Sequence, residues 1–188
     1  MGLEFARLLG SAAMATERTE LFIPPEDIQR RVKELAERLS ADLAGKCPLM
    51  LGILKGCFVF MSDLLRHMRL PVEVDFVRLA SYGSGTESSG QVRMTKPPEA
   101  ELGGRTVVVV EDIVDTGLTL SWLRERLKEM NPKELKFCVL LDKPSRRKVP
   151  FTPEYVGFSV PDEFLVGYGL DYNERYRELP GIYKLVME

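Results

Sequence analysis

One segment limits the possible folds of this chain more than any other. Residues 106–110 are all β-branched, which is typical of a strand buried on both faces. Two acidic residues, Glu111 and Asp112, follow this run, and a turn of small residues then opens a helix. A buried strand that leads through a short turn into a helix indicates an α/β protein built from βαβ units.

The rest of the chain supports this prediction. Apolar residues at helical spacing predict helices at residues 26–43, 58–68 and 119–130. Apolar runs predict buried strands at residues 48–54, 72–80, 106–110 and 135–141, with shorter runs around Val156 and Val166. We therefore predict a single domain over residues 1–188, with a mostly parallel central sheet, helices on both faces and ligands at the carboxyl ends of the strands.

Composition excludes several classes of protein. The 188 residues carry a net charge of -2, which argues against binding to nucleic acid through bulk positive charge. The odd set of cysteines, Cys47, Cys57 and Cys138, contains no CxxC pair, which favours a reduced, cytoplasmic setting. The single histidine, His67, argues against a histidine-based zinc site. No apolar run approaches the roughly 20 residues that span a bilayer, so we predict no membrane partner.

Two segments stand apart from this pattern. Residues 1–13 are predicted to be an extension that precedes a natural start at Met14. The small residues around Met14 have the form of a signal-peptide cleavage site, but Glu4 lies where such a peptide is basic. Residues 82–104 form a long polar stretch with several glycines, and we predict a flexible active-site loop there.

The turn after the acidic pair is suited to bind an anion. Residues 116–119 can direct several backbone amides at one point, and the following helix adds the positive end of its dipole. Gly117 permits close backbone approach. Carboxylates beside a phosphate require hydroxyl groups or a cation between them, and Mg²⁺ prefers such oxygen ligands. The alternative is a strand that ends in solvated acids before a capped helix.

Residues 107–119 resemble the motif that binds phosphoribosyl pyrophosphate (PRPP) in type I phosphoribosyltransferases. Other motifs narrow the resemblance to the bacterial hypoxanthine-guanine branch, namely Leu54-Lys55-Gly56, Ala80-Ser81-Tyr82-Gly83, Leu141-Asp142-Lys143 and the segment from Val156 to Arg177. The resemblance covers residues 20–186. It implies the type I phosphoribosyltransferase fold, in which N- and C-terminal segments form a small hood and residues 155–188 contribute to the hood and to a purine site.

The resemblance also implies an activity in purine salvage. Such an enzyme is a pentosyltransferase that moves the 5-phosphoribosyl group of PRPP to N9 of hypoxanthine or guanine, with Mg²⁺ as cofactor. The products are IMP or GMP and pyrophosphate. A homodimer or homotetramer is expected. The alternatives are an RNA-binding regulator on the same fold and a transferase for adenine, orotate or uracil, while a dinucleotide-binding enzyme lacks its GxGxxG motif here.

Residue roles at the PRPP site follow from the same resemblance. Glu111 and Asp112 are expected at the ribose hydroxyls, directly or through Mg²⁺. Asp115 is expected near N7 of the purine as the catalytic carboxylate, although aspartate is also a common helix cap. The 5′-phosphate is expected within the turn formed by Asp115, Thr116, Gly117, Leu118 and Thr119. Many family members have a lysine where this chain has Leu118, so that contact is missing.

The pyrophosphate is expected on the other side of the ribose. The resemblance places it at Lys55 and Gly56, which are joined in the family by a peptide bond that can be cis, and at Arg177, whose planar fork suits the anion. Ser81 and Tyr82 are expected at the hinge of a lid over the bound PRPP.

A third set of residues is expected at the purine. Lys143, which only donates hydrogen bonds, suits the O6 atom of a 6-oxopurine. Phe164 is expected to stack on the ring, although core packing is its alternative, and the carbonyl of Leu165 should face the purine edge. Asp171 is expected beside the purine and at a second Mg²⁺ ion. A solvated loop is predicted for the basic residues Arg146, Arg147 and Lys148.

Overall fold

The computed structural model describes residues 17–81 and 92–187, and its main feature is a six-stranded sheet in the order β4-β3-β2-β5-β6-β7. Neighbouring strands pair in parallel, except that β4 runs antiparallel to β3. The strands are β2 (Leu49–Leu54), β3 (Glu73–Ser81), β4 (Val92–Lys96), β5 (Thr106–Val114), β6 (Glu134–Asp142) and β7 (Tyr155–Ser159). The predicted mostly parallel sheet is confirmed.

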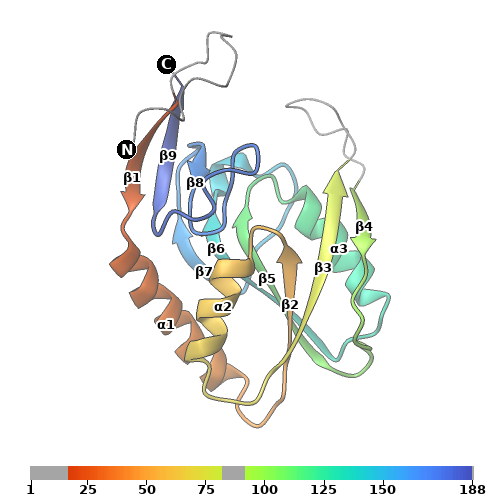
Figure 1. Cartoon of the computed structure of the whole chain (residues 1–188). Coiled ribbons are helices and arrows are strands. Elements are labelled where there is room, and N and C mark those ends of the chain that lie inside the picture. Colours follow the sequence, from red (N-terminus) through yellow and green to blue (C-terminus); the bar gives the residue numbers. More distant parts are fainter. Residues whose placement is uncertain (1–16, 82–91, 188) are drawn as a thin grey trace, which may run out of the picture.

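Helices cover both faces of this sheet (Figure 1). Val108 and Val110 of β5 pack in one apolar cluster with α1 (Pro25–Asp42) and α2 (Phe58–His67). Val107 and Val109 point to the opposite face, in a cluster with α3 (Leu118–Lys128). Because alternate residues of a strand point to opposite faces, a continuous valine run is what a strand between two helical layers requires.

The sequence of α1 explains its place in the fold. The helix begins at Pro25, whose missing amide costs nothing in the first turn, and Glu26 and Asp27 lie at the positive end of the helix dipole. Its apolar residues repeat at helical spacing and are buried, namely Ile28, Val32, Leu35, Ala36 and Leu39. The amphipathic pattern therefore fixes which face of α1 packs on the sheet.

A second, three-stranded antiparallel sheet forms a hood beside the carboxyl ends of the large sheet (Figure 1). Its central strand is β9 (Ile182–Met187), which pairs with β1 (Glu17–Ile23) on one side and β8 (Leu165–Val166) on the other. The hood thus joins an early and a late segment of the chain, as the resemblance implied.

Two predictions about local structure were wrong. β5 continues to Val114, so the acidic pair lies within the strand and not after it. Residues 92–96, predicted as part of a loop over residues 82–104, form β4. The alternation of Val92 and Met94 with polar residues is a strand pattern, which the glycines and prolines on either side obscure.

Residues 1–13 and Tyr82 lie outside the described residues. In residues 17–81 and 92–187, none of the helices has the length and apolar character of a membrane span.

Candidate functional site

A pocket of about 140 Å³ lies where β5 ends and α3 begins. Asp115, Thr116, Gly117 and Thr119 line it together with Glu111 and nearby apolar residues of both elements. Gly117 has φ 80°, a backbone conformation that favours glycine, and it immediately precedes α3. Because the first amides of a helix lack partners within the helix, the pocket offers donors and a positive dipole end to an anion.

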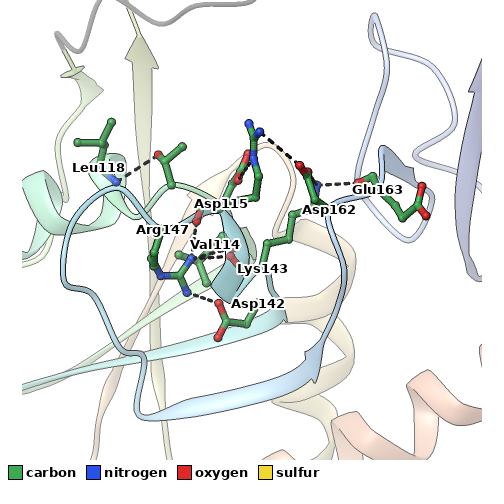
Figure 2. Close-up of polar contacts among 10 residues, drawn as sticks. Val114, Asp115, Leu118, Asp142, Lys143, Arg147, Asp162 and Glu163 are labelled. Carbon is green, nitrogen blue, oxygen red and sulfur yellow. Dashed lines mark hydrogen bonds and ion pairs between the residues drawn. The ribbon is translucent and has the colours of Figure 1, made fainter.

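The turn around this pocket is fixed by Arg147. Its guanidinium donates to the backbone carbonyls of Asp115 and Val114 and to that of Phe151, and it pairs with the Asp142 carboxylate. Figure 2 shows this side chain reaching under the turn toward Asp142. The prediction of a solvated side chain for Arg147 was therefore wrong, because a large part of its guanidinium is used to hold the backbone that carries Asp115.

Arg146 is exposed, as predicted for this loop, but its side chain makes two contacts that the prediction did not include. Its Nε atom donates to Oδ1 of Asp115 at 3.0 Å, and its NH1 atom donates to Oδ2 of Asp162 at 3.4 Å. The short helix Pro144–Arg146 turns the chain after β6 so that this side chain reaches the end of β5. The candidate catalytic carboxylate thus has a cationic partner that the local sequence did not indicate.

The acidic pair is unusual in its electrostatics. Asp112 is 8% exposed, and Oε2 of Glu111 is enclosed with no hydrogen-bond partner among the described residues. Burial, followed by the neighbouring charge of Asp112, raises the pKa of Glu111 well above its ordinary value. Burial also raises the pKa of Asp112 to about 6, against the lowering effects of hydrogen bonds and of Arg177. Both carboxyl groups are therefore poised to gain from hydroxyl donors or from a cation.

These side chains fit part of a magnesium site. Mg²⁺ is often held by one or two carboxylates together with waters and phosphate oxygens of the substrate, and Glu111 supplies an unpartnered oxygen beside Asp112. Within residues 17–81 and 92–187, no group of three or more His, Cys, Asp and Glu side chains is arranged to hold a metal by itself. The remaining ligands would have to come from substrate and water.

The segment after β2 approaches the acidic pair closely. A methyl group on Gly56 would lie 1.7 Å from Oδ2 of Asp112, and one on Gly169 would lie 2.3 Å from the carbonyl oxygen of Gly56. The cis peptide bond lies between Leu54 and Lys55, one residue before the bond between Lys55 and Gly56 that the sequence interpretation considered. The strand end, the acidic pair and the hood thus meet at two glycines.

Lys55 and Arg177 also come together, through a shared carboxylate. Oε2 of Glu174 lies 2.8 Å from Nζ of Lys55 and 3.4 Å from NH2 of Arg177. Arg177 donates in addition to the carbonyl of Gly169 at 2.7 Å, and its NH2 atom lies 2.8 Å from Oδ1 of Asp171. The other carboxylate oxygen of Asp171 accepts from the amide of Glu174. Asp171 therefore orients Arg177, and both of its oxygens already have partners.

Three of the predicted purine residues lie at the end of β6 and at the start of β8, which belongs to the hood. Lys143 is only 8% exposed, and its Nζ atom donates to the carbonyl of Glu163 at 2.6 Å. Phe164 is 52% exposed, so the alternative of core packing is wrong, and its ring meets the edge of Tyr172 at 5.4 Å between centroids. Leu165 is buried at the start of β8. A lysine and an exposed aromatic ring are thus held on either side of Glu163.

The structure brings most predicted residues to one edge of the sheet. The acidic pair lies near the end of β5, the turn of residues 115–119 follows that strand, and Lys55-Gly56 follows the neighbouring strand β2. Arg177 lowers the pKa of Asp112 and shares the Glu174 carboxylate with Lys55. Ser81 ends β3, the next strand along the sheet. The sequence interpretation missed the roles of Arg146, Arg147, Gly169 and Glu174. Repeated basic residues and tyrosine-rich loops carry no local signal for contacts of such long sequence separation.

Comparison with known proteins finds a family model and relatives that match most of this chain. A family model described as a phosphoribosyl transferase domain matches residues 25–173. The hypoxanthine-guanine phosphoribosyltransferase of Bacillus subtilis is 47% identical over 163 residues, which are 87% of this chain and 91% of that protein. A crystal structure of a hypoxanthine-guanine phosphoribosyltransferase from Bacillus anthracis has a TM-score of 0.85 and 48% identity, covering 89% of this chain and 98% of that one.

A further relative is longer. The bifunctional protein TilS/HprT of Listeria innocua is 45% identical over 173 residues, or 92% of this chain. This chain spans 27% of the length of that relative.

Proposed function

This chain belongs to the phosphoribosyltransferase family, in its hypoxanthine-guanine branch, and on that premise we propose that it transfers the 5-phosphoribosyl group of PRPP to N9 of hypoxanthine or guanine. The observation that carries the proposal is the pocket at the end of β5, lined by Asp115, Thr116, Gly117 and Thr119. A pocket of this size, at a helix N-terminus and beside a buried acidic pair, suits a phosphate attached to a sugar.

The two charged ends of PRPP have separate partners in this proposal. The 5′-phosphate lies in the turn from Asp115 to Thr119. Backbone amides bind it there, because this chain has Leu118 where many family members have a lysine. The pyrophosphate lies against Lys55, the Gly56 amide and Arg177. The two cations and the amide donor stabilise the negative charge that the leaving group gains. Asp171 is proposed first as the residue that orients Arg177, since a role at a second magnesium ion requires that contact to open.

The ribose lies between them, at Glu111 and Asp112. The unpartnered oxygen of Glu111 supports this placement, because ribose hydroxyls are donors. Mg²⁺, when bound, would neutralise charge on pyrophosphate and share these carboxylates.

The purine lies at Lys143 and Phe164. Among the described residues, the ammonium group of Lys143 donates one hydrogen bond, to the Glu163 carbonyl. Since a lysine has three protons to donate, the group retains donors for O6 of hypoxanthine or guanine. The exposed ring of Phe164 is available for stacking. The backbone carbonyl of Leu165 is proposed to accept from the purine edge.

The reaction forms one bond and breaks one. N9 of the purine forms a bond to C1′ of the ribose, and the bond from C1′ to the pyrophosphate oxygen breaks with its electron pair. The purine must also lose one proton. The Asp115 carboxylate is proposed to accept or share that proton at N7, which makes it the catalytic residue.

The cellular setting is also a proposal. We place the activity in purine salvage in the cytoplasm, and we expect a homodimer or homotetramer, which light scattering of the purified protein will distinguish.

Ser81 and Tyr82 are proposed to contact bound PRPP.

The test is a spectrophotometric assay with PRPP, Mg²⁺ and hypoxanthine, guanine, xanthine or adenine, with Asp115→Asn alongside. Nucleotide formation from a 6-oxopurine, slowed by Asp115→Asn, supports the proposal. Binding of PRPP or nucleotide without turnover of any 6-oxopurine would refute the enzymatic activity and favour a regulatory protein on this fold.

A further inference from the structure

Arg146 lies between two carboxylates that come from different parts of the site. Its Nε atom is 3.0 Å from Oδ1 of Asp115, in the turn before α3, and its NH1 atom is 3.4 Å from Oδ2 of Asp162, in the loop before β8. All three side chains are partly exposed, so these ion pairs contribute little to the stability of the fold. What they determine is the direction in which each carboxylate points.

The backbone that carries Arg146 is itself well fixed. The next residue, Arg147, donates to the carbonyls of Val114 and Asp115 and pairs with Asp142. The amide of Arg146 donates to the carbonyl of Lys143 within the short helix Pro144–Arg146. The guanidinium of Arg146 therefore starts from a backbone that is hydrogen-bonded to the same turn as Asp115.

Asp162 connects Arg146 to the proposed purine residues. Asp162 also lies 3.9 Å from Nζ of Lys143, which in turn donates to the carbonyl of Glu163. Figure 2 shows the Lys143 side chain reaching toward Asp162 and the backbone of Glu163. A planar fork that contacts both acids can hold Asp115 in one orientation relative to the lysine.

We propose that Arg146 is a positioning residue, which holds the Asp115 carboxylate toward the purine while Asp162 holds the other side of the guanidinium. This inference rests on the proposed function. Without Arg146 the Asp115 side chain samples several rotamers, of which a fraction is productive, and catalysis slows because orientation of a reacting group is lost. The binding of PRPP does not depend on this contact.

A double-mutant cycle tests the inference. Arg146→Gln is compared with Arg146→Lys and with Lys148→Gln, which removes the same charge from an exposed site on the same loop. Arg146→Gln is expected to lower kcat by roughly tenfold with little change in the KM for PRPP, Arg146→Lys to recover part of the loss, and Lys148→Gln to leave kcat unchanged. In an Asp115→Asn background, measured at high enzyme concentration, Arg146→Gln is expected to cause no further loss.

The opposite results are equally clear. An equal loss from Arg146→Gln in both backgrounds overturns the inference, since the arginine would then act independently of Asp115. An unchanged kcat in Arg146→Gln, or an equal loss in Lys148→Gln, overturns it as well. Each of these results leaves the proposed function intact if the unmodified protein forms nucleotide, whereas its failure to form any nucleotide overturns the proposed function and the inference with it.

Discussion

A methyl group on Gly56 would lie 1.7 Å from Oδ2 of Asp112, so the backbone after β2 packs directly against the acidic pair of β5. No side chain fits between them without a shift of the strand end or of the carboxylate. We therefore expect Gly56→Ala to displace Asp112, to lower kcat/KM for PRPP by at least about tenfold and to destabilise the fold by about 1–3 kcal/mol. Steady-state kinetics and urea unfolding check both effects.

Gly103→Ala is the matched control for this change. Among the described residues, a Cβ atom on Gly103 would have one neighbour within 4 Å, the carbonyl of Met130 at 3.9 Å, which is an ordinary contact. Full activity of Gly56→Ala would show that the close approach to Asp112 is not needed for PRPP binding.

Lys143 is a buried cation that, among the described residues, donates one hydrogen bond, to the backbone carbonyl of Glu163. Replacing it with glutamine removes a charged donor from the proposed O6 position, and hydrogen bonds to charged groups contribute about 1.5–3 kcal/mol. We expect Lys143→Gln to raise the KM for hypoxanthine and guanine on the order of tenfold or more, with a smaller effect on the KM for PRPP. A KM for hypoxanthine equal to that of the unmodified protein would argue against contact of Lys143 with the purine.

Glu174 holds Lys55 and Arg177 with one oxygen, at the position proposed for pyrophosphate. Since this carboxylate competes with an anionic ligand for the same two cations, Glu174→Gln should bind pyrophosphate roughly two- to fivefold more tightly, as expected for partly exposed ion pairs. Product-inhibition constants measure the change. Glu178→Gln, an exposed acid on the same loop, is the control and should not alter the inhibition constant.

Asp75 gives the fold a dependence on pH. Burial alone would raise the pKa of this carboxyl group, but the amides of Ala100, Phe76 and Glu99, together with Lys96, outweigh it, and the net pKa lies below the ordinary value of 3.8. A lowered pKa contributes stability that is present above pH 3.8 and is lost as the pH falls through the pKa of the folded state.

Asp75→Asn should therefore lower the free energy of unfolding at pH 7 by about 1–3 kcal/mol, and the difference should shrink in strongly acidic solution. Urea unfolding at pH 7 and in strongly acidic solution measures this difference in the free energy of unfolding. Glu101→Gln, at an exposed position on the β4–β5 connection that supplies the amides of Glu99 and Ala100, should change stability by less than about 0.5 kcal/mol. A cost of Asp75→Asn that does not vary with pH would assign it to packing and not to charge.

The sheet and its helices could be predicted from the sequence because their signals are local. The valine run of β5 and the helical spacing of α1 each indicate which faces are buried, and the structure confirms both. β4 escaped prediction because five residues of weak alternation lie between prolines and glycines. The type and order of elements were thus more predictable than their ends.

The candidate site also has a part that the sequence predicts and a part that it does not. Asp115 and its turn were predictable from a continuous motif, but the partner of Asp115 was not. Arg146 reaches it from 31 residues further along the chain, through a short helix after β6. The shared use of Glu174 by Lys55 and Arg177 joins residues separated by more than 100 positions. Such contacts depend on the packed fold, and no local periodicity encodes them.

The pairing of β1 with β9 has a consequence for how the molecule assembles. Glu17 pairs with Met187, so this ladder closes nearly the longest loop that the described chain can form. Loop closure costs entropy that local contacts avoid, so the large sheet should form before the hood. Hydrogen exchange should then show the amides of β9 opening more readily than those of β5. Among the described strands β8 pairs only with β9, so the segment beside Phe164 should open with β9. The proposed purine site would then be lost while the turn of residues 115–119 stays folded.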